Sequence, residues 1–296
     1  SNSSTATTNP AVTIRSVGSN GGQAVAFTYD LARSVIYTHQ GNPSWSGDDR
    51  DGNGVIRPND LFYGNKTGDV QPDYVDLNKV AIPQADEQQR LLANIITEVN
   101  KDRKPLPKLS YFPYNKKAVV VLAADDHASG TNTIGALDYQ LAQSAPGCSV
   151  ADWECIRSTS LIYTDTQLSN AQALAYYNQG FDFGVHMSTG CNNWTPISLA
   201  DATNTDLTAF QAKYTSLPAQ HANRIHCIAW SDYVSAAKLE AQKGLRIDLN
   251  YYYWPGSWVA NRPGFMTGSG MSMRFADTDG SLVDTYQVPS HLVNES

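Results

Sequence analysis

The sequence is poor in charged residues, and the basic ones are the scarcer. Only 17% of the 296 residues are charged, with 21 lysines and arginines against 28 aspartates and glutamates, so the formal net charge is -7. Nucleic-acid-binding proteins usually present a basic stripe. Here the densest basic run, residues 101–108, is short and broken by prolines. The composition therefore argues against a nucleic-acid partner.

Long apolar runs are also missing. No run approaches the ~20 apolar residues that a helix needs to cross a bilayer, so we expect no membrane span. The N-terminus is polar and shows no signal peptide, as in a trimmed secreted chain or a cytosolic one. The 16 tyrosines, 6 tryptophans and 21 glycines, with few lysines, are common in secreted carbohydrate-active proteins. We expect a secreted or cell-surface protein and leave its oligomeric state open.

The four cysteines lack the CxxC spacing of a structural zinc site. Four cysteines allow two disulfides in three pairings, and four buried thiols are the alternative. Cys191 and Cys227 follow two strand-like segments and would pair if those strands are neighbours. Cys148 and Cys155 would then pair across a short loop. This pairing is a hypothesis, and it implies an oxidising compartment.

Changes in composition divide the chain into three parts. Residues 1–20 read as a disordered tail. Residues 21–115 form an N-terminal segment of unknown role, with a strand and then a helix or second strand over 23–38, and a helix over 85–100. Residues 116–296 have a different rhythm, which starts with the apolar run AVVVLAA, typical of a strand that is covered on both faces.

From this point strands and helices alternate. The predicted strands cover 118–124, 159–164, 181–186, 224–230 and 245–251, and the predicted helices cover 165–179, 199–217 and 235–243. Such alternation implies parallel βα units, and hence an α/β fold that is either a barrel or an open sheet.

Carboxylates and imidazoles recur where the predicted strands end. Asp125 and Asp126 follow the first strand, His186 ends the third, and His226 lies in the fourth. In parallel βα folds the reactive groups gather at the carboxyl ends of the strands. One aspartate with two histidines is a common ligand set for Zn²⁺, and a neighbouring aspartate can take a proton from water.

These segments resemble the polysaccharide deacetylase family, which has the nodulation-type chitooligosaccharide deacetylase fold. Residues 123–127 (AADDH) are similar to its Thr-Phe-Asp-Asp-Gly motif, and 180–186 (GFDFGVH) to its Gly-His-Glu-Ile-Gly-Asn-His motif. Residues 160–163 (SLIY) match an intervening strand, and 224–226 (RIH) loosely match Arg-x-Pro. The C-terminal stretch looks similar to a branch that contains galactosaminogalactan deacetylases. The resemblance implies an incomplete (β/α) barrel from about residue 117, with an N-terminal α/β appendage.

The resemblance also implies roles. Asp125 would be the catalytic base, and Asp126 and His186 would bind the metal ion. The second metal histidine of the family falls on Gly190 here, so we assign that ligand to His226, with His127 as the alternative.

The remaining assignments are less closely tied to family motifs. The only late histidine, His291, would protonate the leaving amine. Arg224, Asp248, Tyr252 and Trp254 are candidate substrate-binding residues.

A second motif lies upstream, in residues 49–60. Asp49, Asp51, Asn53 and Asp60 occupy positions 1, 3, 5 and 12 of an EF-hand-like calcium loop, and Gly54 occupies position 6. Position 12 is an aspartate rather than the longer glutamate, and a proline stands where the exit helix would begin. A plain turn loop therefore remains the alternative.

We therefore expect a metal-dependent hydrolase, with zinc as the ion, which removes N-acetyl groups from an amino-sugar polysaccharide; calcium is the candidate ion of the second motif, beside the plain turn loop. One alternative is a non-catalytic carbohydrate-binding relic of the same fold. Another is a glycoside hydrolase that uses Asp125 and Asp248 as its carboxylate pair, for which their separation would be decisive.

Overall fold

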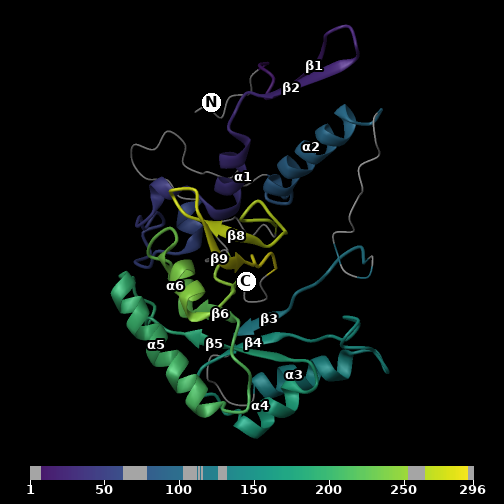
Figure 1. Ribbon diagram of the computed structural model, residues 1–296. Coiled ribbons are helices and arrows are strands. Elements are labelled where there is room, and N and C mark those ends of the chain that lie inside the picture. Colours follow the sequence, from purple (N-terminus) through teal and green to yellow (C-terminus); the bar gives the residue numbers. More distant parts are fainter. Residues whose placement is uncertain are drawn as a thin grey trace.

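The computed structural model describes residues 8–62, 79–102, 112, 114, 116–125, 132–252 and 264–292. Its centre is a seven-stranded sheet in the order β3-β4-β5-β6-β7-β9-β8 (Figure 1). The strands are β3 (Ala123–Asp125), β4 (Thr159–Ile162), β5 (Asp182–Met187), β6 (Ala222–Ile225), β7 (Ile247–Asp248), β8 (Met273–Ala276) and β9 (Leu282–Gln287). All neighbours pair in parallel except β8 and β9, which are antiparallel. The chain is thus a mixed α/β protein, as predicted.

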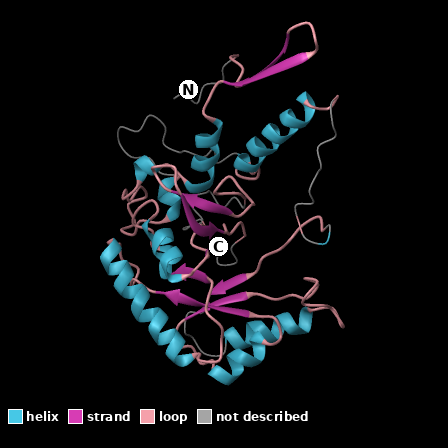
Figure 2. Cartoon of the chain, viewed as in Figure 1, coloured by secondary structure: helices cyan, strands magenta, loops and turns pink. Residues whose placement is uncertain are grey.

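Helices follow the strands along the chain and line one side of the sheet (Figure 2). They are α3 (Asn132–Gln143), α4 (Asn170–Tyr177), α5 (Pro196–Lys213) and α6 (Ser235–Lys243). Their ends follow local chemistry, since Ser169 caps α4 in a capping box with Gln172, and Thr195 does the same for α5 with Ser198. Gly244 ends α6 in the left-handed conformation at φ 77°, where glycine has no steric penalty.

The sheet is curved, because side chains from distant strands meet on its inner face. The inner cluster consists of Leu161, Ala222 and Leu249, with Ala123 and Val288 packed against it. Leu161 and Ala222 lie on either side of β5, which a flat sheet would keep roughly 10 Å apart. Gly184 of β5 permits the approach, since a Cβ there would lie 2.6 Å from the Ala222 oxygen and 2.7 Å from Leu161 Cδ2. Within the described residues, β3 and β8 are the two edges of this sheet.

The main core lies on the opposite, outer face, under the helices. Because successive side chains of a strand point to opposite faces, Phe183, Val185 and Met187 of β5 face this core while Gly184 and His186 face inward. The helices contribute Phe210 from α5 and Ala237 from α6 among other residues. The inner face is therefore left to a small apolar cluster and to polar residues.

The N-terminal segment packs against the C-terminal strands. It contains a hairpin of β1 (Val12–Val17) and β2 (Gly22–Phe27), helices α1 (Leu31–Gln40) and α2 (Gln84–Val99), and 3-10 turns η1 (Pro43–Trp45) and η2 (Pro58–Leu61). The Gln40 amide bonds both backbone groups of Ala276 in β8, at 2.8 and 2.9 Å. Buried His39 places Nδ1 2.6 Å from Gln287 Oε1 in β9. The end of α1 thus covers the β8 edge of the sheet and bonds backbone groups there that a further strand would otherwise pair.

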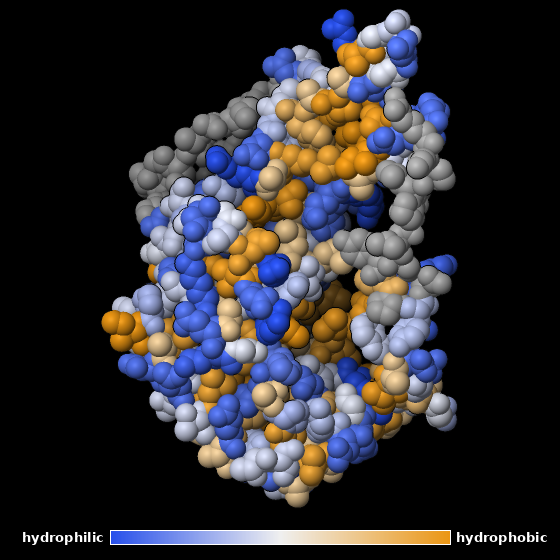
Figure 3. Space-filling view, viewed as in Figure 1, coloured by the Kyte–Doolittle hydropathy of each residue, from blue (hydrophilic) through white to orange (hydrophobic). Residues whose placement is uncertain are grey.

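Apolar side chains gather on the upper part of the molecule, over α2 and the β1–β2 hairpin (Figure 3). Leu91 and Ile96 of α2 are 40% and 45% exposed, and Ile14 of β1 is 53% exposed. The predicted apolar face of this helix exists, but much of it faces outward in the described part of the molecule.

The first and fourth predicted strands are wrong in extent. The strand expected over 118–124 begins only at Ala123, and Val120 and Val121 are 80% and 68% exposed rather than covered on both faces. β3 pairs only with β4, which begins at Thr159, so the preceding valines lie beyond the sheet. The strand expected over 224–230 ends at Ile225 and passes into a 3-10 turn, η5 (His226–Ile228).

Other boundaries also differ from the predicted ones. Residues 12–17, expected within the tail, form β1, and the strand expected over 245–251 is ordered as β7 for two residues only. The helix expected over 165–179 starts at Asn170 because Ser169 caps it. The predictions of α2 and α6 are confirmed closely, whereas α3, β8 and β9 were not predicted.

Both predicted disulfides are present, Cys148–Cys155 and Cys191–Cys227, each with a Cα–Cα distance of 5.3 Å. The alternative of four free thiols is therefore wrong. Across the part of the chain that the structure describes, no helix combines the length and apolar character required to cross a bilayer.

Candidate metal and hydrolytic site

Polar side chains from neighbouring strands meet on the inner face, at the carboxyl end of the sheet. The strand period of two explains this, because the residues two positions after inward-facing Gly184 and Ala222 also face inward, and these are His186 and Arg224. Asp125 pairs in register with Leu161, which places its carboxylate on the same face. Tyr163, two residues after Leu161, joins them.

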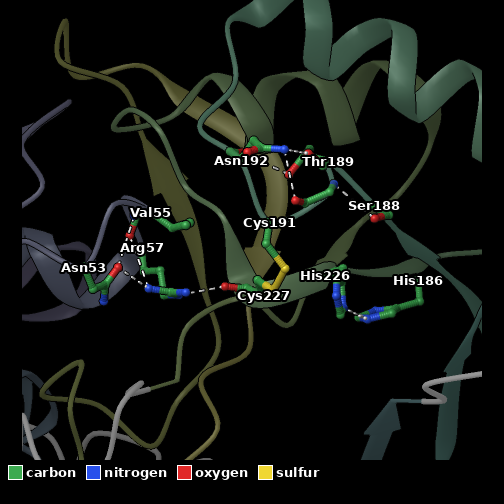
Figure 4. Close-up of a disulfide and its surroundings, with 11 residues drawn as sticks. Asn53, Val55, Arg57, His186, Ser188, Thr189, Cys191, Asn192, His226 and Cys227 are labelled. Atoms are coloured by element: carbon green, nitrogen blue, oxygen red, sulfur yellow. Dashed lines mark hydrogen bonds between the residues drawn. A yellow bond between two sulfur atoms is a disulfide. The ribbon is translucent and has the colours of Figure 1, made fainter.

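His186 and His226 face each other across this end of the sheet (Figure 4). The distance from His186 Nε2 to His226 Nδ1 is 3.3 Å, and the ring of Tyr163 lies 4.7 Å from the His186 ring. His186 is buried, and its Nδ1 is 3.0 Å from the carbonyl oxygen of Arg224. A carbonyl only accepts hydrogen bonds, so Nδ1 carries the proton and the Nε2 lone pair points at His226.

The distance between the two facing nitrogens is that of a hydrogen bond, and it is also compatible with a shared divalent metal ion. Two imidazole nitrogens at ~2.05 Å from a tetrahedral Zn²⁺ lie roughly 3.3 Å apart, which matches the distance between the two facing nitrogens. A histidine ligand usually donates its other N–H to a carbonyl or carboxylate, which fixes the tautomer, and the Arg224 carbonyl plays that part for His186. The pair can therefore supply two of the ligands predicted from the sequence.

Asp125 forms an ion pair with Arg224, the residue whose carbonyl oxygen lies 3.0 Å from His186 Nδ1. Arg224 Nη1 donates to Asp125 Oδ1 at 2.9 Å, and the two side chains are only 9% and 10% exposed. The guanidinium is itself fixed, since Nε donates to the Leu249 carbonyl at 2.8 Å and Nη2 lies 3.3 Å from Ser290 Oγ. The guanidinium also lies over the ring of Tyr252, with its Cζ 5.2 Å from the ring centroid. Arg224, predicted to bind substrate, thus orients the Asp125 carboxylate, and Tyr252 borders the same group.

The Cys191–Cys227 disulfide adjoins the pair. Ligand atoms of Cys191, His226 and Cys227 lie within 4.8 Å of one another. In the disulfide neither sulfur is a thiolate, which is the form that binds zinc, so we do not count the cysteines as ligands. The disulfide ties the loop after β5 to the turn that carries His226.

The other predicted residues divide into two groups. Asp126, His127 and Trp254 lie outside the described residues. His291 is described, but its Nε2 lies 2.8 Å from the Ser269 carbonyl and its ring contacts that of Phe265 in a tilted arrangement with centroids 4.8 Å apart. The neighbouring Ser290, rather than His291, reaches Arg224.

Asp248 lies on the outer face, because it precedes inward-facing Leu249. It is fully buried, accepts from the Asn250 backbone at 3.1 Å, and interacts with Glu240 of α6, which Asn223 bonds at 2.6 Å. Burial raises the pKa of Asp248 to about 6 and, with the Asp248 charge, raises the pKa of Glu240 well above its usual range. We therefore place Asp248 in the framework rather than in contact with substrate.

Glu240→Gln is expected to stabilise the protein at pH 8 and to flatten its pH dependence. A carboxyl whose pKa is raised by folding keeps its proton when the unfolded chain releases it. Stability is then full below the unfolded pKa of about 4.3 and falls as the pH rises toward the folded pKa. A pKa that is one pH unit higher in the folded protein than in the unfolded chain corresponds to ~1.4 kcal/mol. Glutamine preserves the bond to Asn223 without the titration.

The measurement is urea unfolding of both proteins at pH 5 and pH 8. Glu98→Gln, on an exposed part of α2, is the matched control, and it should follow the wild type. An equal loss of stability in wild type and Glu240→Gln between the two pH values would contradict the assignment.

The predicted calcium loop brings three carboxylates together. Oxygens of Asp49, Asp51 and Asp60 lie within 4.8 Å of one another, so they could hold a cation. Burial raises the pKa of Asp60 to about 6 and also raises the pKa of Asp51. Asn53 Oδ1 accepts from Val55 N at 3.1 Å and from Arg57 Nη1 at 2.7 Å. Both lone pairs are therefore in use, and the predicted role of Asn53 as a ligand is not supported.

Two residues of the site were not predicted from the sequence. Tyr163 could have been found from strand alternation, since it lies two residues beyond Leu161 and four beyond Thr159. Ser290 could not, because β9 was not predicted. No protein-family model, curated protein or solved structure matches this chain. The proposed function therefore rests on the resemblance of the sequence motifs and on the geometry of the site.

Proposed function

We propose that this chain is a metal-dependent hydrolase that removes N-acetyl groups from an amino-sugar polysaccharide. The observation that carries the proposal is the 3.3 Å approach of His186 Nε2 to His226 Nδ1, beside the Asp125–Arg224 ion pair. It supports the roles that the resemblance to polysaccharide deacetylases gave to Asp125 and His186, and our choice of His226 as the second histidine.

The ligands we propose are His186, His226 and Asp126, with zinc as the ion. Such an ion, when bound, polarises a carbonyl and lowers the pKa of a water molecule. The chain's own contribution is orientation and proton transfer. Asp125 takes a proton from the attacking water, and Arg224 keeps its carboxylate aimed at the site through the 2.9 Å bond. We propose His291 as the proton donor to the leaving amine, which requires it to leave Ser269.

The curvature of the sheet and the disulfides support two finer proposals. Contacts across β5 and a sequential strand order from β3 to β7 are what the wall of an incomplete (β/α) barrel requires. We propose that residues 116–296 form such a barrel, with residues 21–115 as its appendage. Two disulfides form and persist in oxidising compartments, which supports secretion or display on the cell surface.

The geometry gives less support to the two rival functions. A glycoside hydrolase needs two carboxylates that face one substrate, but Asp125 is on the inner face and Asp248 is buried on the outer one. A non-catalytic carbohydrate-binding relic does not require a buried arginine–aspartate pair on the same face of the sheet as a histidine pair. The enzyme is therefore the interpretation that the geometry favours.

Acetate release tests the proposal. Protein stripped of metal with a chelator and reloaded with one equivalent of zinc is incubated with N-acetylglucosamine and N-acetylgalactosamine oligomers, and acetate is measured enzymatically. We expect release from the zinc-loaded protein and none from the stripped protein. Zinc bound at one ion per chain without acetate from either oligomer would favour the relic.

We also propose calcium as the cation of the Asp49–Asp51–Asp60 group. Calorimetric titration with calcium chloride at pH 7.5 should give binding in the ~10⁻⁴–10⁻³ M range typical of extracellular modules, and weaker binding at pH 5, because protonation of Asp60 competes below its pKa of about 6. Asp51→Asn should weaken binding at least tenfold, whereas exposed Asp284→Asn should not. Equal heats for wild type and Asp51→Asn would remove the calcium site.

A further inference from the structure

The turn that carries His226 has an unfavourable backbone conformation. Directly after His226, Cys227 has φ 59° and Ile228 has φ 47°, in the left-handed region. For L-residues this region costs roughly 1–2 kcal/mol per residue, and a β-branched residue is rarely found there. Such conformations persist only where the surrounding structure enforces them, and they cluster at functional sites.

Some of the contacts that hold this turn come from the loop after β5. The disulfide joins Cys227 to Cys191 in the loop after β5, and Trp194 of the same loop donates its indole N–H to the Ala229 carbonyl at 2.9 Å. These contacts hold one side of the turn.

The other side of the turn is held by the N-terminal segment. Arg57 Nε donates to the Cys227 carbonyl at 2.9 Å, and Trp230 N donates to the Ile56 carbonyl at 2.7 Å. Ile56 N in turn donates to Asn193 Oδ1 at 2.7 Å. Residues 56 and 57 thus bond both the His226 turn and the loop that is disulfide-linked to it.

Arg57 is itself held firmly enough to act as a clamp. It is 7% exposed, and its Nη1 donates to Asn53 Oδ1 at 2.7 Å and to the Val55 carbonyl at 3.3 Å. Its backbone N–H donates to Asp60 Oδ2 at 2.8 Å. Figure 4 shows the guanidinium between Asn53 and the Cys227 carbonyl, with His226 on the far side of the disulfide.

We infer that the N-terminal segment completes the metal site by holding the His226 turn, with Arg57 as the positioning residue. This inference rests on the proposed function for the role of His226 as a metal ligand. It assigns a task to residues 49–61, which lie far from the histidines in sequence. Loss of this outer support should weaken metal binding, since groups that orient ligands typically contribute 10–100-fold to affinity.

The test compares Arg57→Met with Arg50→Met. Arg50 is equally buried, at 7% exposure, and its guanidinium lies over the Trp45 ring at 3.6 Å in the same loop. Zinc affinity is measured by competition with a chromophoric chelator, and amide hydrogen exchange of residues 226–230 is measured in the metal-free protein. We expect Arg57→Met to bind zinc 10–100-fold more weakly and to exchange faster in this segment. Arg50→Met should stay within about threefold of the wild type in both readouts.

Arg57→Lys keeps the charge but not the two-ended geometry, so it should fall between Arg57→Met and the wild type. Equal zinc affinity and equal exchange for Arg57→Met and Arg50→Met would overturn the inference. If the wild type bound no zinc while Arg57→Met alone exchanged faster over 226–230, the clamp would stand and the proposed function would fail.

Should Arg57→Met not fold, Asn193→Ala provides the second test, because Asn193 bonds Ile56 N and the Gly54 carbonyl, at 2.7 and 3.2 Å. Unchanged exchange over 226–230 in that variant would overturn the clamp.

Discussion

His226→Ala is expected to lower the zinc affinity of the chain by at least ~100-fold, since even outer-shell partners of metal ligands contribute 10–100-fold. His226 Nδ1 faces His186 Nε2 at 3.3 Å, and alanine leaves His186 without its facing nitrogen. The measurement is zinc content after dialysis against a weak chelator, with about one ion per chain in the wild type. His186→Ala should give the same loss, because the two imidazoles share the ion.

His221→Ala is the matched control, since His221 is exposed and precedes β6, whereas His226 follows its carboxyl end. This control should keep its zinc. If His226→Ala retained its zinc fully, the second histidine ligand would have to be another residue. His127 would then be the first to be substituted. Absence of zinc from the wild type after reloading would remove the metal site altogether.

How far the sequence predicts this site depends on what determines each residue's position. The alternation of strands with helices predicts the parallel order, and the period of two within a strand predicts that His186 and Arg224 face inward. The pairing of Cys191 with Cys227 follows from the adjacency of β5 and β6. The strand order, the facing of these side chains and the disulfide pairing each depend on local residue patterns and on which strands are neighbours. Both can be inferred from the sequence.

The inaccurate predictions share a cause, because they concern positions that long-range contacts decide. The segment RIHCIAW has the β-branched and aromatic residues of a strand, yet the strand ends at Ile225. The turn that follows is held by the disulfide of Cys227 and by the hydrogen bond from Arg57 to the Cys227 carbonyl. The bond from Arg224 to Asp125 was not predicted, because nothing local reveals that Asp125, 99 residues away, is its partner. β9 was not predicted, so Ser290 was not connected with the site.

Asp125→Asn is expected to reduce acetate release 10²–10⁴-fold, the usual contribution of a general acid–base group, while zinc affinity changes less than about threefold. Asparagine has nearly the same volume, and its Oδ1 can still accept from Arg224 Nη1, so the inner face should keep its packing. What it loses is the ability to take a proton from water. The measurement pairs the initial rate of acetate release with chelator competition on the same preparation.

The pairing of rate and affinity in Asp125→Asn separates catalysis from binding. Exposed Asp284→Asn, whose partner Arg246 is on the surface, is the control for loss of a charge and should keep the wild-type rate. If Asp125→Asn lost zinc together with activity, Asp125 would be a ligand and the base would have to be another group. If it kept both, the Asp125–Arg224 pair would be a structural ion pair. Only loss of rate with retention of zinc makes Asp125 the base, because a proton acceptor matters to the reaction and not to the ion.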